Sequence, residues 1–130
     1  MVVIDTNVYI YFLEKNPKYF SAAEKVIKRA LEDGPICVPT ITLMEILSGT
    51  SEEEIVLDFF LSSPFVLEDF TAQTAIEAGK LRYKNKSLKS ADAILLATGI
   101  VNNASHFITN DEHLEKLQLG IKIIPINSYQ

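Results

Sequence analysis

Several residue types are scarce in this chain of 130 residues, and each scarcity excludes a class of protein. The only cysteine, Cys37, cannot form an internal disulfide, and it lies between apolar residues as a core residue would. No apolar run approaches the roughly 20 residues of a membrane helix, and no basic segment at the start suggests a signal peptide. His106 and His113 show no ligand spacing. We therefore expect a cytoplasmic chain without a membrane segment, which a single cysteine also fits.

Positive charge is also short, because 12 Lys and Arg residues face 17 Asp and Glu residues and the net charge is −5. This balance is unfavourable for binding phosphate backbones, which normally relies on Lys and Arg. The distribution is uneven, however, and one short segment holds five of the twelve basic residues: Lys80, Arg82, Lys84, Lys86 and Lys89. The ordinary interpretation is a solvated helix end and loop, and the alternative is a phosphate-binding segment.

Apolar runs at strand and helix spacing alternate along the whole chain. The pattern predicts strands at residues 2–4, 36–38, 65–67, 106–108 and 121–126, and helices at about 8–13, 20–33, 41–48, 55–61, 71–83, 91–101 and 111–117. This alternation is typical of a three-layer α/β/α domain with a parallel sheet, and we expect residues 1–130 to form one such domain. Residues 2–4 read as a central strand buried on both faces, and Pro125 favours an edge position for the last strand.

Local signals predict how the helices begin and pack. Thr6 and Thr40 are predicted N-caps, and Ser51 with Glu54 has capping-box spacing. Five residues of the helix at 71–83 are available for packing: Ala72, Ala75, Ile76, Gly79 and Leu81. Four aromatic residues exceed what one face of each helix needs to bury, and some are expected at a dimer interface: Tyr9, Phe12, Phe59 and Phe60.

Two acids directly follow predicted strands. Asp5 comes after residues 2–4, and Asp111 comes shortly after residues 106–108. The carboxyl ends of parallel strands share one edge of the sheet, which is where ligands bind in open α/β folds. Each acid also has a purely structural explanation, Asp5 as a turn residue and Asp111 as a first-turn acid with Asn110 as the cap.

Two further acids lie in apolar helices. Glu45 has apolar neighbours and lies about a turn and a half from the same sheet edge, although it could point outward on a polar stripe with Thr42. Asp92 is the only charge between Ser90 and Ser105, but an acid in the first turn of a helix is favoured by the helix dipole in any case.

If the four acids meet, they must take up protons or bind a cation. Two unit charges 4 Å apart repel by about 4 kcal/mol at an effective dielectric of 20. A donor set made only of carboxylate oxygens suits Mg²⁺ or Mn²⁺.

The chain resembles the PIN-domain ribonucleases over its whole length. Four motifs carry the resemblance, in the family's order: Asp5, Thr6 and Asn7 after an apolar strand, residues 42–46 around Glu45, residues 90–98 around Asp92, and residues 107–111 ending in Asp111. The resemblance implies a five-stranded parallel sheet and a metal-dependent endoribonuclease. It also implies that Asp5, Glu45, Asp92 and Asp111 form the acidic set, supported by Thr6, Asn7 and Thr109.

The small, stand-alone chain is most similar to VapC-type toxins. That subgroup implies a homodimer, a VapB-type antitoxin as partner, and structured RNA such as tRNA as the target.

The acids themselves indicate a mechanism. One or two Mg²⁺ ions held by carboxylates would orient a water, lower its pKa and stabilise charge on the scissile phosphate. We expect Asp5 to be the central ligand, Glu45 and Asp92 to complete the shell, and Asp111 to hold a second ion or a water. The basic segment at residues 80–89 is expected to guide the RNA backbone.

Three other interpretations remain open at this level. One is a phosphoacceptor receiver domain, although its strand-end acids are placed differently from those here. The others are a catalytically idle PIN fold used for binding and a PIN nuclease that acts on DNA or in RNA processing.

Overall fold

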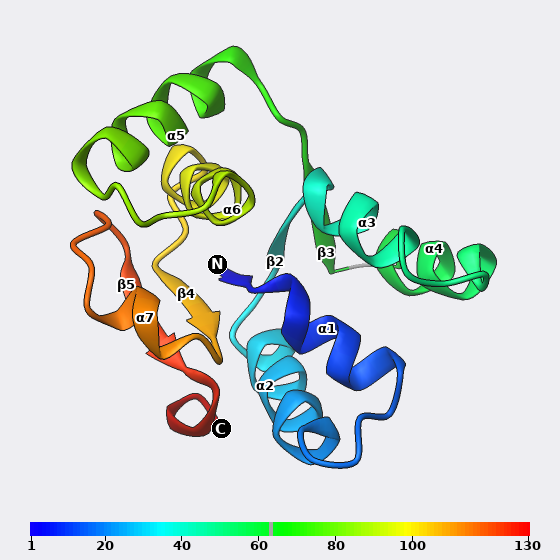
Figure 1. The fold of residues 1–130 in the computed structure, drawn as a ribbon. Coiled ribbons are helices and arrows are strands. Elements are labelled where there is room, and N and C mark those ends of the chain that lie inside the picture. The colour runs from blue at the N-terminus through cyan, green and yellow to red at the C-terminus, as the bar shows by residue number, and fades with distance from the viewer. Residues whose placement is uncertain (63) are drawn as a thin grey trace.

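A computed structural model describes residues 1–62 and 64–130, and in this part of the chain a five-stranded parallel sheet is covered by helices on both faces (Figure 1). The strands are β1 (Val2–Ile4), β2 (Ile36–Pro39), β3 (Phe65–Glu68), β4 (His106–Thr109) and β5 (Lys122–Pro125). The helices are α1 (Thr6–Leu13), α2 (Phe20–Glu32), α3 (Thr40–Leu47), α4 (Glu53–Leu61), α5 (Ala72–Lys84), α6 (Ser90–Val101) and α7 (Glu112–Glu115), and a 3-10 turn, η1 (Ile126–Ser128), follows β5. The predicted three-layer α/β/α fold is confirmed. None of the described helices is long and apolar enough to cross a membrane.

The strand order is β3-β2-β1-β4-β5, and every neighbouring pair is parallel. β1 is therefore the central strand and β5 an edge strand, as the sequence predicts. Receiver domains have the order 2-1-3-4-5. The receiver interpretation is wrong for this chain because β1, rather than β3, is in the middle.

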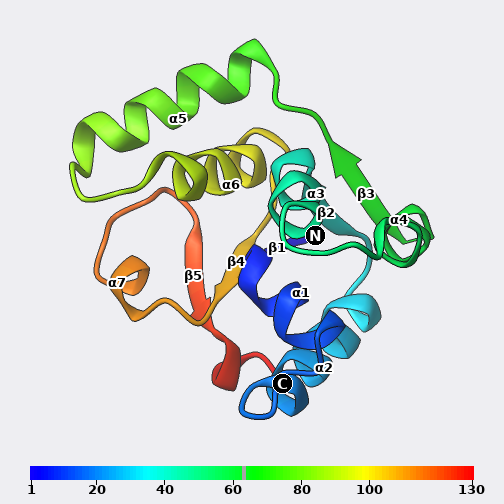
Figure 2. The ribbon, with the colours of Figure 1, turned by 45° about the vertical axis from the view of Figure 1, so that its right-hand side comes forward.

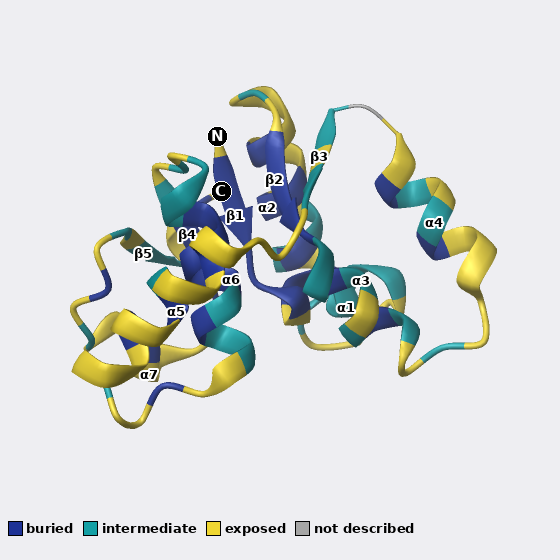
Figure 3. Cartoon of the chain, turned by 90° about the horizontal axis from the view of Figure 1, so that it is seen from above, coloured by how far each residue is buried: buried dark blue, intermediate teal, exposed yellow. Residues whose placement is uncertain are grey.

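The two faces of the sheet are covered by different helices (Figure 2). Val2 and Ile4 pack with α1, α2 and α4, whereas Val3 points to the opposite face and packs with α5 and α6. β1 and β2 are buried, while the outer side of α5 is exposed (Figure 3). α6 lies so close to β1 that a Cβ at Gly99 would be 2.8 Å from Val3 Cγ2. Gly99 thereby permits α6 to pack closely against β1 at Val3.

The predicted caps are wrong in detail. Thr6 and Thr40 are the first helical residues of α1 and α3 rather than their N-caps. α4 begins at Glu53 and has no side-chain cap hydrogen bond, so Ser51 and Glu54 do not form the predicted capping box. The Thr6 hydroxyl is instead used in a contact between helices, described below. Cap statistics describe local preferences, and a tertiary hydrogen bond has overridden the preference here.

The packing face predicted for α5 is also wrong, apart from Leu81. The buried residues of α5 are Thr74, Ala78 and Leu81, and Ile76 is 61% exposed. A threonine can lie on the buried face because its hydroxyl is 3.0 Å from that of Thr71, the residue that caps the helix. The apolar residues of α5 are therefore a poor guide to the side that packs on α6.

The four aromatic residues considered for a dimer interface differ in exposure. Tyr9 and Phe60 are buried, with ring centroids 4.9 Å apart, and Phe59 and Phe65 adjoin them. Phe12 packs on Phe59 at 5.8 Å, and both rings are only partly buried. Tyr9 and Phe60 therefore belong to the core, while an interface that includes Phe12 and Phe59 stays a prediction. The Tyr9 hydroxyl is buried in this cluster without a hydrogen-bond partner among the described residues.

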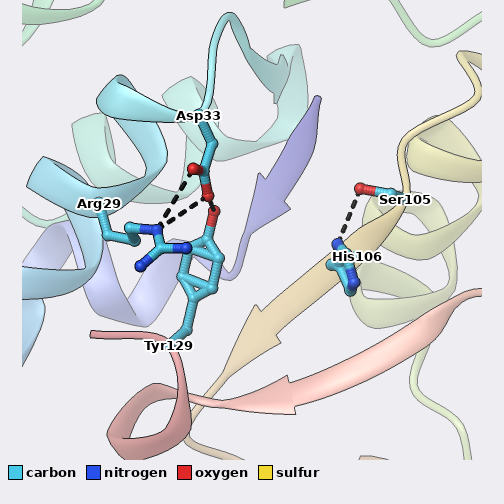
Figure 4. A network of polar contacts seen from close by, with 5 residues as sticks. All are labelled: Arg29, Asp33, Ser105, His106 and Tyr129. Atoms are coloured by element: carbon cyan, nitrogen blue, oxygen red, sulfur yellow. Dashed lines mark hydrogen bonds and ion pairs between the residues drawn. The ribbon is translucent and has the colours of Figure 1, made fainter.

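The last turn of the chain is tied to the end of α2 (Figure 4). The Tyr129 hydroxyl donates to Asp33 Oδ2 at 2.5 Å, and Arg29 Nε donates to both oxygens of Asp33 at 3.2 Å. Hydrogen bonding from Tyr129 lowers the pKa of Asp33, while burial and the nearby carboxylate raise the pKa of Tyr129 to about 12. Ser105, which bonds to His106, also donates to the carbonyl of Met1 and so fixes the start of β1 beside β4.

Candidate active site

The candidate site lies where β1 and β4 end side by side. The connections from these strands lead to opposite halves of the sheet, and such a switch point forms the ligand-binding crevice of open α/β folds. Ile4 is paired with Ile108, so the next residues, Asp5 and Thr109, are neighbours across the two strand ends. The Asp5 amide extends the ladder by donating to the carbonyl of Ile108 at 2.8 Å.

Asp5 is held rigidly in this crevice. Its side chain is only 6% exposed, and its Oδ2 accepts a 2.7 Å hydrogen bond from the Thr109 hydroxyl. The pKa of Asp5 is raised to about 6, mainly by burial and also by the charges of Asp92 and Glu45, while the bond from Thr109 partly opposes the shift. Three segments distant in sequence thus bring negative charge to one place. A cation bound there would stabilise the ionised form.

Glu45 reaches this region through contacts between α1 and α3. The Thr6 hydroxyl donates to Glu45 Oε1 at 2.8 Å, and its oxygen lies 3.1 Å from the Thr42 hydroxyl. Because Thr6 has only one hydroxyl proton, Thr42 is the donor in the second bond. Thr42 is fully buried. The stripe of Thr42 and Glu45 therefore faces α1, and the alternative of an outward-pointing polar stripe is wrong.

Asp92 lies in the first turn of α6 and is partly buried. Burial raises its pKa, as do the charges of Asp111 and Glu45, while Lys89 and His113 lower it. Asp92 is therefore close enough to two other acids to be influenced by both. The basic residue that precedes α6, Lys89, partly compensates this concentration of negative charge.

Asp111 is exposed and serves as the N-cap of α7, where its Oδ1 accepts the His113 amide at 2.9 Å. The prediction that Asn110 caps this helix is wrong. The Asp111 amide donates to the Thr109 hydroxyl oxygen at 2.9 Å. One hydroxyl, that of Thr109, therefore links Asp5 and Asp111.

The remaining predicted residues occupy different positions. The backbone amide of Asn7 hydrogen-bonds to the Asp5 carboxylate, while its side chain is exposed. All five basic residues predicted to contact RNA are exposed: Lys80, Arg82, Lys84, Lys86 and Lys89. Arg82 also has a structural role, because its Nε donates to the carbonyl of Leu88 at 3.0 Å.

Sequence reasoning missed two polar contacts at this edge. Thr42 supports Glu45 through Thr6, and its spacing of three residues from Glu45 was a usable signal, since such residues share a helix face. The Ser87 hydroxyl lies 3.0 Å from His113 Nε2 and joins the loop at residues 85–89 to α7. No sequence signal pointed to that contact.

The donor set fits Mg²⁺ or Mn²⁺ in chemistry. Among the described residues no three acidic, histidine or cysteine side chains form a ready-made metal-binding group. Magnesium does not require one, because it keeps several waters and binds proteins through one or two carboxylates. The buried carboxylate of Asp5, with its pKa raised partly by Asp92 and Glu45, offers negative oxygen ligands in a place that favours a cation.

Comparison with known proteins agrees with this geometry. The family model described as PIN domain matches residues 2–119. The chain belongs to the PIN-domain family. Proteins of this family are nucleases that generally use divalent metal ions. Among curated proteins, none matches this chain.

Solved structures of toxin–antitoxin complexes share the PIN fold of this chain. A toxin–antitoxin complex from Klebsiella pneumoniae matches with a TM-score of 0.74 and 25% identity over 97% of this chain and 98% of that one. VapBC2 from Rickettsia felis, bound to a promoter DNA fragment, matches with a TM-score of 0.75 and 21% identity over 96% and 98%. DNA-bound VapBC from Salmonella typhimurium matches with a TM-score of 0.74 and 22% identity over 96% and 97%.

Proposed function

We propose that this PIN domain is an endoribonuclease dependent on Mg²⁺ or Mn²⁺, and that it is the toxin of a type II toxin–antitoxin pair. The observation that carries the proposal is the state of Asp5. Its carboxylate is almost fully buried, and its pKa is raised to about 6 by burial and by Asp92 and Glu45. A fold has no structural need for acids from three segments to face one another, whereas a site for a divalent cation does.

Each residue has a defined role in this proposal. Asp5 would be the central ligand, and Glu45 and Asp92 would supply the other oxygens. A bound Mg²⁺ would supply positive charge that lowers the pKa of a water and stabilises charge on the scissile phosphate. Thr109 orients Asp5 through its hydroxyl, and Asp111 would hold a second ion or a water.

The orientation of Glu45 rests on a second hydroxyl pair. Thr6 donates to its carboxylate and is itself anchored to the buried Thr42. Outer hydrogen bonds of this kind fix the geometry of metal-binding carboxylates. Asp5 and Glu45 are therefore oriented in the same way, each by a hydrogen bond from a threonine hydroxyl.

The proposed partners follow from the related complexes. Because chains of the same fold occur in toxin–antitoxin and VapBC complexes, we propose a VapB-type antitoxin as partner and cytoplasmic action. Structured RNA such as tRNA is the proposed substrate, as the resemblance of the motifs to VapC-type toxins implies. The homodimer stays a prediction. Sedimentation of the purified chain at micromolar concentration tests it, and a monomer alone would contradict it.

An RNA cleavage assay tests the function. Wild-type chain and Asp5→Asn are incubated with end-labelled tRNA and with DNA of the same sequence, in Mg²⁺, Mn²⁺ or EDTA. We expect metal-dependent cleavage of RNA by the wild type alone, leaving a 5′-phosphate and a 3′-hydroxyl. Equal cleavage by both chains would reveal a contaminating nuclease or a wrong site. A 2′,3′-cyclic phosphate would contradict attack by water, and cleavage of DNA alone would replace RNA as the substrate.

A further inference from the structure

Tyr83 is an aromatic residue without a structural role. It lies near the end of α5 and is 76% exposed, more than any other large hydrophobic side chain among the described residues. It packs with neither of the two core clusters. The core therefore does not use this ring, and most of it is available to contact a ligand.

Positive charge surrounds this ring. Lys86 Nζ lies 4.2 Å from the ring centroid, and Lys80, three residues earlier on α5, shares its helix face. Lys84 is the next residue along the helix. The chain as a whole is acidic, with a net charge of −5, so this is an exceptional local excess of cations.

The loop at residues 85–89 runs from the helix turn that carries Tyr83 to the acid site. Arg82, the residue before Tyr83, donates from its Nε to the carbonyl of Leu88 at 3.0 Å, and Leu88 itself is only 1% exposed. Ser87 contacts His113 of α7, the helix capped by Asp111. The loop then ends at Lys89, whose charge acts on Asp92. A short and well-anchored stretch of chain therefore joins the end of α5 to the acids.

We propose that Tyr83, with Lys86 beside it, is a stacking subsite for one unpaired base of the RNA, next to the nucleotides held at Asp92. This inference rests on the proposed ribonuclease function and adds a specificity to it. An exposed aromatic ring within a basic strip is the arrangement by which proteins bind single-stranded nucleic acid. A stacking subsite requires an unstacked base, so the preferred substrate is a loop or single-stranded segment rather than a continuous duplex.

RNA binding to catalytically inactive chains tests the subsite. All chains carry Asp5→Asn, and fluorescence anisotropy measures their affinity for a labelled single-stranded RNA of about ten nucleotides. Four chains are compared: one with Tyr83 intact, Tyr83→Ala, Tyr83→Phe, and Ile76→Ala as the control. Ile76 is exposed on the same helix outside the basic segment. We expect Tyr83→Ala to weaken binding about tenfold, because a stacked base is lost. Tyr83→Phe and Ile76→Ala are expected to bind normally.

The salt dependence separates stacking from charge. Tyr83→Ala should leave the slope of log affinity against log salt unchanged, whereas Lys86→Gln should reduce it by about one. Circular dichroism confirms that each variant is folded. Normal RNA binding by folded Tyr83→Ala, or equal loss with a duplex and with a single strand, would overturn the inference.

The test also distinguishes the subsite from the nuclease. If the wild type cleaves RNA and Tyr83→Ala binds and cleaves it equally well, the subsite is wrong and the nuclease stands. If the wild type cleaves no RNA but binding still depends on the Tyr83 ring, the nuclease is wrong and the subsite stands as part of a binding module.

Discussion

Asp5 and Asp111 follow adjacent strands at the same edge of the sheet, yet the structure holds them very differently. Asp5 is 6% exposed and accepts from the buried hydroxyl of Thr109. Asp111 is exposed, and its carboxylate caps the short helix α7 by accepting the His113 amide. Position at a strand end brings an acid to the candidate site, and under the proposed function the depth of burial decides whether it would be a fixed ligand or an adjustable one.

The same contrast divides the other two acids. Glu45 is fixed by the Thr6 hydroxyl, which is bonded in turn to Thr42. The pKa of Asp92 is raised first by partial burial and then by the charge of Asp111, which Lys89 opposes, and no side-chain hydrogen bond to its carboxylate is seen among the described residues. The half of the candidate site near β1 and α3 is therefore fixed by hydrogen bonds between side chains, while the half near α6 and α7 has no such bonds to Asp92 among the described residues.

The largest expected effect is the loss of activity in Asp5→Asn. The amide keeps the size of the carboxylate but removes its charge from the centre of the site. We expect RNA cleavage to fall at least about 100-fold, as when a preorganised electrostatic group is removed from an active site. Initial rates with Mg²⁺ on the same RNA measure this. If the loss were smaller than that of Asp111→Asn, the assignment of Asp5 as the fixed ligand would be wrong.

The same substitution should stabilise the metal-free fold. Because the pKa of Asp5 is about 6 in the folded chain and 3.8 in the unfolded reference, the folded chain binds this proton more tightly. Stability from the protonated form is complete below pH 3.8 and is lost as the pH rises through about 6.

At pH 7 Asp5→Asn should therefore unfold with a higher free energy, by up to about 3 kcal/mol. Urea unfolding in EDTA measures the difference between wild type and variant at pH 4 and pH 7. If the difference in unfolding free energy between the two chains does not grow from pH 4 to pH 7, the carboxylate of Asp5 is not destabilised by burial and the prediction is wrong. Adding Mg²⁺ at pH 7 should stabilise the wild type only.

Removing the hydroxyl of Thr109 should have the next largest effect. Thr109→Val deletes both the donor to Asp5 and the acceptor for the Asp111 amide without changing the shape of the side chain. We expect a loss of about 10- to 100-fold in activity, typical of an outer hydrogen bond to a metal ligand.

The control is Thr98→Val, because Thr98 is equally buried but its hydroxyl bonds within its own helix. The pH profile provides a second readout. The bond from Thr109 lowers the pKa of Asp5, so its removal should shift the acidic limb of the activity profile to higher pH. Equal effects of the two valine variants would show a general loss of stability instead.

The smallest expected effect is that of Asp111→Asn. Asparagine caps helices as well as aspartate does, so α7 should remain intact and only the charge is lost. We expect activity to fall about tenfold, with the midpoint of urea unfolding unchanged. Asp111→Ala, which also removes the cap, should in addition lose about 1 kcal/mol of stability. If Asp111→Asn lost as much activity as Asp5→Asn, the distinction between fixed and adjustable acids would be wrong.

Much of this site could be predicted from the sequence because strand ends are easy to locate. The buried run at residues 2–4 identified β1, and its central position followed from an apolar pattern without alternation. The placing of Asp5 and Asp111 at one edge then needed only the parallel topology. The motif around Asp92 gave a third segment, on a helix whose close packing against β1 at Gly99 no local pattern reveals.

Hydroxyl groups account for much of what the sequence could not provide. Thr6 was predicted as a cap and instead donates to Glu45, because a bond between helices outweighs a local preference. The orientation of α5 was mistaken because Thr74 is buried with its own polar partner while Ile76 stays in water. A threonine side chain can be buried or exposed, because its hydroxyl can bond to protein or to water. Whether a given threonine is buried therefore depends on which distant segments pack against it.

The bond between Thr109 and Asp5 spans 104 positions of the chain. A ribosome that adds about 5–20 residues per second makes the two partners roughly 5–20 seconds apart. During that interval β1 lacks its neighbour β4, and Asp5 lacks the Thr109 hydroxyl that orients its carboxylate. A nascent chain therefore cannot assemble this crevice until nearly all of it has been synthesised.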